Sequence, residues 1–162
     1  MKIAIYPGSY DPITNGHLDI IKRSTKLFDK IVVAVARNAE KGSALFSESE
    51  RITMINQSIS HLKNVEVDSF HGLLVNYASE KNSIAIIRGL RALSDFEFEF
   101  KMALMNRSLK EEISTVFMMP HEKYTHISSS LVKEVASLGG NVSAYVPQHV
   151  EIALKESFSG IK

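Results

Sequence analysis

A polar segment near the N-terminus, YPGSYDPITNGH at residues 6–17, carries an unusual share of side chains able to do chemistry. It follows a short apolar run and ends where a helical pattern begins, a connection for which about two to six residues are enough. Two glycines, a serine, a threonine, an aspartate and the terminal His17 are more than a turn and a cap need. These residue types indicate a binding or catalytic loop. The competing interpretation is that a lone histidine at a helix start is a cap or a solvent contact.

Three cationic side chains further along the chain predict an anionic ligand. Lys41 lies in a glycine-containing loop, and Arg88 and Arg91 stand three positions apart. Arginine offers a fork of donors that matches phosphate oxygens, and lysine offers a mobile point charge. In the simpler alternative, Lys41 is a solvated lysine and the two arginines pair with nearby carboxylates at the surface, which contributes little to stability.

Three serines in a row, at residues 128–130, stand where another helical pattern begins. Free backbone amides and the positive end of a helix dipole favour an anion at such a position. One serine alone could be only the helix cap. The two standard phosphate loops, G-x-x-x-x-G-K-[ST] and a G-x-G-x-x-G after the first strand, are absent, which argues against P-loop enzymes and dinucleotide oxidoreductases.

These residues need a scaffold, and the hydrophobic pattern predicts a parallel sheet. Apolar, β-branched runs recur at residues 2–6, 30–36, 64–70, 83–88 and 114–119. Stretches with helical spacing separate them, an alternation typical of parallel βαβ units. The prediction is therefore an α/β fold, a single domain over residues 1–162, with a five-stranded, doubly wound parallel sheet and helices on both faces.

The spacing of apolar residues predicts helix faces, and capping-box patterns predict where helices begin. The apolar positions that share a face are Leu18, Ile21 and Phe28 after the first strand and Ile52, Ile55, Ile59 and Leu62 after the second. Ser47 with Glu50, and Ser94 with Glu97, have the spacing of capping boxes. A last helix is expected after Pro147.

The stretch DFEFEF at residues 95–100 is ambiguous, because strict alternation favours a strand. The upstream capping signal and the downstream KMALMNR favour a helix. In that helix Phe96 and Phe100, one turn apart, would face the core, and Phe98 would point elsewhere.

Nearly all of the unusual polar residues follow the carboxyl ends of the predicted strands. The segment with His17 follows the first strand, Lys41 the second, Arg88 and Arg91 the fourth, and the serines at 128–130 the fifth. In open α/β sheets ligands bind outside the carboxyl ends of the strands, at the point where strand order reverses. The sequence therefore predicts one phosphate-binding site at a single edge of the sheet.

Composition limits the other classes of function. The chain has 162 residues, 44% of them hydrophobic, and its 19 basic residues nearly balance 18 acidic ones. This charge balance provides no field to recruit nucleic acid or an acidic membrane. The absence of cysteine excludes disulfides, zinc–thiolate sites and thiol catalysis. With no signal peptide pattern and no long apolar run, the expected location is the cytoplasm.

The polar blocks together resemble a known family. YPGSYDP followed by Thr14-Asn15-Gly16-His17 is similar to the opening of the bacterial phosphopantetheine adenylyltransferases, nucleotidylyltransferases in which T-x-G-H replaces H-x-G-H. IRGLRALSDFEFE at 87–99 and ISSSLVKEVA at 127–136 resemble further motifs of that family. T-x-G-H alone is a weak signal, but three blocks in order, over essentially the whole chain, are specific.

The resemblance implies a reaction and its partners. The phosphate of 4′-phosphopantetheine would attack the α-phosphorus of ATP in a reversible in-line displacement, giving dephospho-coenzyme A and pyrophosphate in coenzyme A biosynthesis. Such a transfer needs positioning and charge stabilisation rather than a protein nucleophile. The resemblance further implies Mg²⁺ held mainly by substrate phosphates, with no protein ligand for the metal, as well as a homohexamer and feedback by coenzyme A.

The resemblance also implies roles for individual residues. The catalytic groups would be His17, Lys41 and Arg91, and Ser9, Lys41, Leu74 and Arg88 would bind phosphopantetheine. The ATP site would comprise Ser9, Tyr10, Gly16, His17, Gly89, Leu90, Arg91, Glu99, Tyr124, Thr125, His126, Ile127, Ser128, Ser129 and Ser130.

The sequence departs from the family pattern at a few positions. Ser9 stands where the family more often has threonine, and Tyr10 where it has phenylalanine; YTH at 124–126 replaces a more aromatic stretch.

Two rival functions stay open, and one rival is a sister nucleotidylyltransferase acting on nicotinamide mononucleotide or a polyol phosphate. The other is a non-catalytic nucleotide-binding module, for which the retention of His17, Lys41 and Arg91 would be unnecessary.

Overall fold

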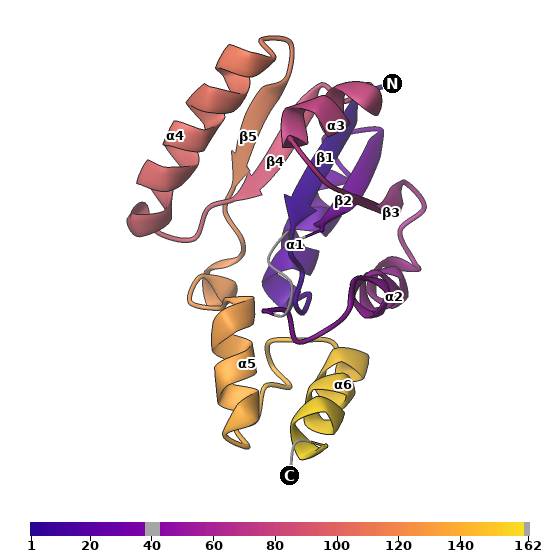
Figure 1. Ribbon diagram of the computed structural model, residues 1–162, viewed down its shortest axis with the longest axis vertical. Helices are drawn as coiled ribbons and strands as arrows, with labels where there is room; N and C mark the ends of the chain where they lie inside the picture. Colours follow the sequence, from indigo (N-terminus) through magenta and orange to yellow (C-terminus); the bar gives the residue numbers. More distant parts are fainter. Residues whose placement is uncertain (38–42, 161–162) are drawn as a thin grey trace.

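The computed structural model describes residues 1–37 and 43–160, and its centre is a five-stranded sheet (Figure 1). All neighbouring strands are parallel, in the order β3-β2-β1-β4-β5. The strands are β1 (Ile3–Gly8), β2 (Lys30–Ala36), β3 (Val65–Phe70), β4 (Ala85–Gly89) and β5 (Ser114–Met118). The five predicted strands and the α/β fold are thus confirmed, with strand ends shifted by one or two residues.

Helices connect the strands and extend the chain beyond the last one. They are α1 (Asn15–Ser24), α2 (Glu48–Ile59), α3 (Leu74–Glu80), α4 (Leu93–Leu109), the short 3-10 helix η1 (Glu122–Tyr124), α5 (Ser129–Ser137) and α6 (Gln148–Ser159). No helix in the described part of the chain is long and apolar enough to cross a membrane.

Side chains that point alternately to the two faces of the sheet form one hydrophobic core on each face. Tyr6 and Val33 point into the larger core, which buries apolar side chains of α1, α2, α5 and α6. Ile5 and Val32, their neighbours in sequence, point into the smaller core beneath α3. Successive strand residues point to opposite faces, so a sheet covered on both sides needs continuous apolar runs. This is why the strands were recognisable in the sequence.

Two capping boxes were predicted, and only one is present. At α2 the Ser47 hydroxyl accepts from the Glu50 amide and the Glu50 carboxylate accepts from the Ser47 amide. The second prediction, Ser94 with Glu97, is wrong, because α4 begins at Leu93 after an uncapped Ala92. Ser94 therefore falls inside the first turn, where its hydroxyl cannot act as an N-cap.

The helical interpretation of DFEFEF is confirmed, but the expected burial of its phenylalanines is wrong. Phe96 and Phe100 stack on each other with ring centroids 5.6 Å apart, yet both stay more than 40% exposed. The reason is the placement of α4, which runs beside β5 at the edge of the molecule instead of covering the sheet (Figure 1). The residue that α4 buries is Glu99.

Candidate active site

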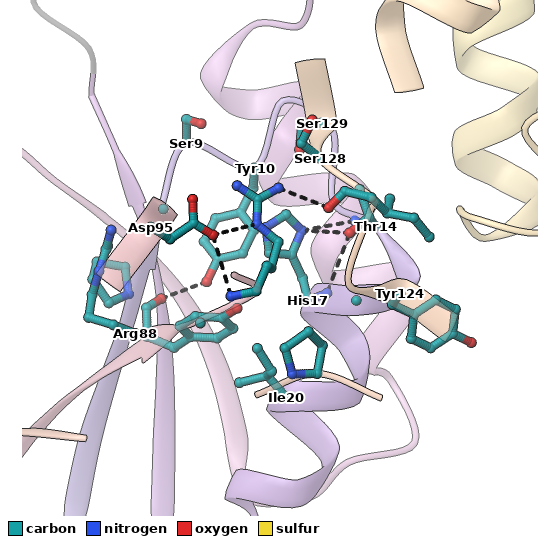
Figure 2. A pocket seen from close by; sticks show the side chains of 18 of the residues that line it. Ser9, Tyr10, Thr14, His17, Ile20, Arg88, Asp95, Tyr124, Ser128 and Ser129 are labelled. Carbon is teal, nitrogen blue, oxygen red and sulfur yellow. Dashed lines mark hydrogen bonds and ion pairs between the residues drawn. The ribbon is translucent and has the colours of Figure 1, made fainter. Parts of the chain in front are cut away.

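A cavity of about 350 Å³ opens at the carboxyl ends of β1 and β4, the pair at which the strand order reverses. This is the position at which open α/β sheets bind ligands. Figure 2 shows side chains from the loop after β1, from α1, from the start of α4 and from the start of α5 converging on it. The lining residues are Tyr6, Pro7, Gly8, Ser9, Tyr10, Thr14, Gly16, His17, Ile20, Arg88, Gly89, Arg91, Asp95, Glu99, Pro120, Tyr124, Ile127, Ser128, Ser129 and Ser130.

Most of the residues predicted for the site meet in this cavity. The exceptions among the described residues are Leu74, Leu90, Thr125 and His126. Lys41 lies outside the described residues. His17, Arg88 and Arg91 therefore share one cleft, and their individual roles remain predictions.

The four exceptions have local structural tasks. Leu74 begins α3 and packs against the smaller core. Leu90 directly follows β4, and its amide donates to the carbonyl of Met118, the last residue of β5. The Thr125 hydroxyl donates to the Glu122 carbonyl, and the exposed His126 ring meets Tyr145 edge-on.

His17 is held by an unusual capping box at the start of α1. The Thr14 hydroxyl accepts from the His17 amide at 3.4 Å, and the His17 Nδ1 accepts from the Thr14 amide at 3.0 Å. In the common form of this motif a Glu or Gln side chain makes the return bond. A backbone amide can only donate, so Nδ1 must be unprotonated, and the neutral ring then carries its proton on Nε2. His17 can thus donate a hydrogen bond while it remains uncharged.

Burial and a nearby cation keep the His17 ring neutral. Desolvation in the first place, and the charge of Arg91 in the second, lower the pKa of His17 from 6.5 to about 4. Both causes disfavour imidazolium, since the charged form loses hydration and faces a like charge. At neutral pH the ring is therefore a neutral donor in this structure.

Two buried tyrosines, Tyr10 and Tyr6, fix the ring from the other side, and sequence reasoning missed Tyr6. The Tyr10 ring meets His17 edge-on at 5.0 Å, and the Tyr6 ring meets Tyr10 edge-on at 5.8 Å. The Tyr10 hydroxyl donates to the Tyr6 carbonyl at 2.8 Å, and burial raises the pKa of both tyrosines. Tyr10 has φ 49, a left-handed conformation that L-residues rarely adopt. This arrangement turns the loop after β1 so that Tyr10 fills the core and Ser9 stays exposed.

The Ser9 end of this loop rests on a buried cation. Arg51 of α2, 4% exposed, donates from Nη1 to the Ser9 carbonyl at 2.6 Å. Its Nε donates to the Ser47 carbonyl at 3.4 Å. Arg51 was not predicted for the site, because a lysine or arginine inside a helix is usually a solvent-exposed residue.

Two carboxylates of α4 orient Arg88, near the end of β4, and Arg91, two residues beyond that strand. The Glu99 carboxylate accepts from Nε and Nη2 of Arg88 at 2.8 and 2.7 Å, a bidentate pair that raises the pKa of Arg88. Asp95 lies 3.3 Å from Nε of Arg91, whose Nη1 donates to the Ile127 carbonyl at 2.9 Å. Since a guanidinium has five N–H donors, both arginines retain donors for a ligand. Pairing with Asp95 and Glu99 was expected only as a surface alternative, but here it occurs at the cavity wall.

Of the three serines at the start of α5, two make hydrogen bonds within the protein and the third is exposed at the cavity. Ser128 is the N-cap, because its hydroxyl accepts from the Leu131 amide at 3.0 Å. The Ser129 hydroxyl donates to the Pro12 carbonyl at 2.7 Å and so ties α5 to the loop after β1. Ser130 is exposed at the cavity rim. The first-turn amides of α5 lie at this rim, where they and the helix dipole favour a phosphate.

Gly89 has a steric role at the cavity floor. A Cβ on this residue would come within 3.0 Å of the Ile20 Cδ1 atom and 3.4 Å of the Tyr6 hydroxyl. A Cβ on Gly16 would make only ordinary contacts, the nearest at 3.5 Å to Tyr124. Crowding against Ile20 and Tyr6 therefore favours glycine at 89, whereas the protein itself does not crowd position 16.

The cavity offers no protein cage for a metal ion. In the described ranges no three histidine, aspartate or glutamate side chains gather as a metal site would require. Its carboxylates, Asp95 and Glu99, are both paired with arginines. A cation in this cavity would have to take its ligands from substrate oxygens and water.

Comparisons with known proteins agree with this geometry. Residues 5–135 match the family model described as cytidylyltransferase-like. The phosphopantetheine adenylyltransferase of Desulfosudis oleivorans is 56% identical over 96% of this chain and 92% of its own length. That of Thermodesulfovibrio yellowstonii is 53% identical over 97% and 98%.

A solved structure shares the fold at low sequence identity. A protein from Vibrio parahaemolyticus, assigned as a nicotinate-nucleotide adenylyltransferase, superposes with a TM-score of 0.72 at 20% identity, covering 98% of this chain and 95% of that one. At this identity the likeness concerns the fold alone, whereas the sequence matches extend over almost the full length of both chains. The chain therefore belongs to the cytidylyltransferase-like family and, within it, to the phosphopantetheine adenylyltransferases.

Proposed function

We propose that this chain transfers the adenylyl group of ATP to the phosphate of 4′-phosphopantetheine, giving dephospho-coenzyme A and pyrophosphate. The transfer is reversible and forms a step of coenzyme A biosynthesis. The observation that carries the proposal is the convergence of the neutral His17 donor and the guanidinium groups of Arg88 and Arg91 on one cavity. Full-length identity to curated phosphopantetheine adenylyltransferases supports the choice of acceptor.

The reaction is a direct displacement at the α-phosphorus. An oxygen of the acceptor phosphate forms the new P–O bond while the bond from the α-phosphorus to the bridging oxygen breaks, and pyrophosphate leaves with that electron pair. The protein positions two anions and stabilises the charge that spreads over the transferring group. No covalent intermediate with the chain is involved.

His17 supplies a hydrogen bond to this transferring group. Its ring proton is on Nε2, and its pKa of about 4 keeps it neutral, so it donates without adding a charge and without losing its proton. A rigid donor that needs no reorientation during the reaction is the most effective kind of charge stabilisation. The capping box with Thr14 and the contact with Tyr10 provide this rigidity.

The remaining cations divide between the two reactants. Arg91 and the first-turn amides of α5, beside Ser129, face the nucleotide phosphates. Arg88, with Lys41 of the loop after β2, takes the acceptor phosphate. This division follows the family resemblance, and for Lys41 the sequence is its only basis.

Mg²⁺ enters with ATP and is bound by phosphate oxygens and water. The carboxylate pairing in the cavity supports this proposal, because Asp95 and Glu99 are directed at arginines. Mg²⁺ commonly retains several waters and is held through substrate phosphates. Phosphoryl-type transfers use such a cation to neutralise charge on the triphosphate.

A homo-oligomer, a hexamer by the family resemblance, is the expected assembly, and α4 is the expected contact. Phe98 and Met105 on this helix are 64% and 57% exposed, and Leu104 is 52% exposed. A row of large apolar side chains on a helix at the molecular edge indicates a protein interface. The proposal also includes feedback by coenzyme A on the enzyme and a location of the enzyme in the cytoplasm.

The test is an acceptor panel with purified protein, ATP and Mg²⁺. Pyrophosphate release and the mass of the adenylylated product are followed with 4′-phosphopantetheine, nicotinamide mononucleotide and glycerol 3-phosphate as acceptors. We expect turnover with 4′-phosphopantetheine and a product of the mass of dephospho-coenzyme A. Turnover with only one of the other acceptors would overturn the substrate assignment, and binding of ATP without turnover on any acceptor would favour a non-catalytic module.

A further inference from the structure

One carboxylate buried beneath the cavity joins three distant segments of the chain. Asp11 is 5% exposed, and its Oδ1 accepts from the Phe46 amide at 2.9 Å. Its Oδ2 accepts from the Leu45 amide at 3.0 Å and from Nζ of Lys133 at 2.8 Å. Asp11 is absent from the cavity lining, so it touches neither reactant site directly.

Each of the joined segments leads to a different wall of the site. Asp11 stands two residues after Ser9, in the loop whose Tyr10 packs against His17. Leu45 follows Lys41 by four residues, and is thus at the base of the predicted acceptor loop. Lys133 lies one helical turn beyond Ser129, at the nucleotide wall. A single side chain therefore touches the supports of both reactants.

The carboxylate is held rigidly in its charged form. Burial alone would raise its pKa, but the Lys133 ammonium and the Phe46 and Leu45 amides lower the pKa of Asp11 below its usual value. Both oxygens are occupied by donors from fixed backbone or helix positions. A buried charge with complete hydrogen bonding restricts its partners to one arrangement.

We propose that Asp11, together with Lys133, is a positioning residue that sets the acceptor-side segment and the nucleotide wall at the separation needed for adenylyl transfer. This inference rests on the proposed function. It differs from a purely structural role in one respect: loss of the link must impair catalysis by protein that is still folded. Misplacing a reactant support by about 1 Å is enough to cost roughly a hundredfold in rate.

The decisive variant is Asp11→Asn. Asparagine keeps the shape of aspartate but has an NH₂ group in place of one carboxylate oxygen. If NH₂ replaces Oδ2, the Leu45 amide and Lys133 lose their acceptor; if it replaces Oδ1, the Phe46 amide loses its acceptor. We expect kcat/KM to fall about ten- to a hundredfold, with higher KM values for both substrates and a lower kcat. The measurement is steady-state kinetics well below the melting temperature, normalised to folded protein by circular dichroism.

Asp68→Asn is the matched control. Asp68 also accepts from a lysine, Lys81, from a backbone amide and from the Tyr77 hydroxyl, but it lies away from the cavity. We expect this variant to melt at a lower temperature while kcat and both KM values stay within about twofold of wild type, as for a substitution remote from the chemistry. If Asp11→Asn behaves in the same way, the inference is wrong.

Lys133→Met tests the link with less risk to folding. It keeps both amide bonds of Asp11 and an unbranched apolar side chain at position 133, but it removes the Nζ atom that ties α5 to Asp11. We expect the KM for ATP to rise more than the KM for phosphopantetheine, because only the nucleotide wall is released. Unchanged kinetic constants in this variant would also overturn the inference.

Amide hydrogen exchange supplies a readout that does not depend on turnover. In Asp11→Asn we expect faster exchange than in wild type at whichever of the Leu45 and Phe46 amides faces the new NH₂ group, with strand β1 unchanged. Unaltered exchange at these two amides contradicts the inference, whether or not the wild type is active. An inactive wild type with faster exchange in the variant instead refutes the proposed function and leaves the structural link standing.

Discussion

At the scale of single residues, the chemistry depends on where one proton sits. The return bond of the capping box occupies Nδ1 of His17 with a backbone donor, and burial with Arg91 lowers the pKa of the ring to about 4. A helix-capping motif thereby selects the tautomer of the proposed catalytic donor. Sequence motifs identify the histidine, but only the hydrogen-bond geometry identifies Nε2 as the nitrogen left to donate to a ligand.

Nitrogen-15 NMR can observe this state directly. We expect His17 at pH 7 to show the neutral pattern with the proton on Nε2, and to titrate at about pH 4. A proton on Nδ1, or a midpoint near 6.5 for His17, would contradict the proposed donor role.

The same pKa shift has a consequence for stability. Since the folded pKa of about 4 lies below the ordinary 6.5, the unfolded chain binds the proton more readily, and acid favours unfolding. The free energy of unfolding should therefore fall as pH drops from about 6.5 to about 4, by on the order of 3 kcal/mol from this group.

Chemical denaturation of wild type and His17→Gln across this range isolates the contribution. Glutamine can still make the return bond of the capping box but does not titrate. As pH falls from about 6.5 to about 4, the unfolding free energy of wild type should decrease steadily relative to that of His17→Gln. A difference independent of pH would show that burial of His17 leaves its titration unchanged.

At the scale of elements, α4 connects the edge of the molecule to the site. Its inward-facing Asp95 and Glu99 orient Arg91 and Arg88, although the helix buries little else. The helix thus belongs to the active site through two carboxylates, and its apolar residues point elsewhere.

Glu99→Gln should weaken the acceptor side of the site. Loss of the bidentate pair releases Arg88, so we expect the KM for phosphopantetheine to rise about tenfold, with a smaller effect on ATP. Glu97→Gln on the same helix is the control, because Glu97 pairs only with the exposed Lys101. Equal kinetic constants in the two variants would exclude the orienting role of Glu99.

The elements were the most predictable level of this structure. Continuous apolar runs such as 30–36 predicted the strands because both faces of the sheet are buried. Ser94 and Phe96 were misjudged because their environment depends on where α4 lies, a tertiary fact that local spacing does not contain. For the same reason the sequence could not reveal that Arg51 supports Ser9 or that Asp11 joins three segments.

At the scale of the whole molecule, the exposed side of α4 carries several large apolar side chains. Phe98 and Met105 lie on a helix beside the edge strand β5, where burial against a second copy would remove apolar surface from water (Figure 1).

Phe98→Glu should dissociate the assembly without unfolding the chain. A charge at a position 64% exposed in the single chain is tolerated there but not in an apolar interface. Light scattering should show a wild-type mass of several chains, a smaller mass for this variant, and the wild-type mass for Lys101→Gln. A monomeric wild type, or no change in Phe98→Glu, would rule out this interface.

The most direct test of the account is the single-turnover rate of dephospho-coenzyme A formation in His17→Ala, measured beside its affinity for ATP. Removal of one transition-state donor should slow the chemical step by at least about 10²- to 10³-fold and leave ATP binding nearly unchanged. His61→Ala should match wild type in both measurements. A His17→Ala protein that forms product at a near-normal rate would contradict the central claim that this neutral imidazole stabilises the transfer.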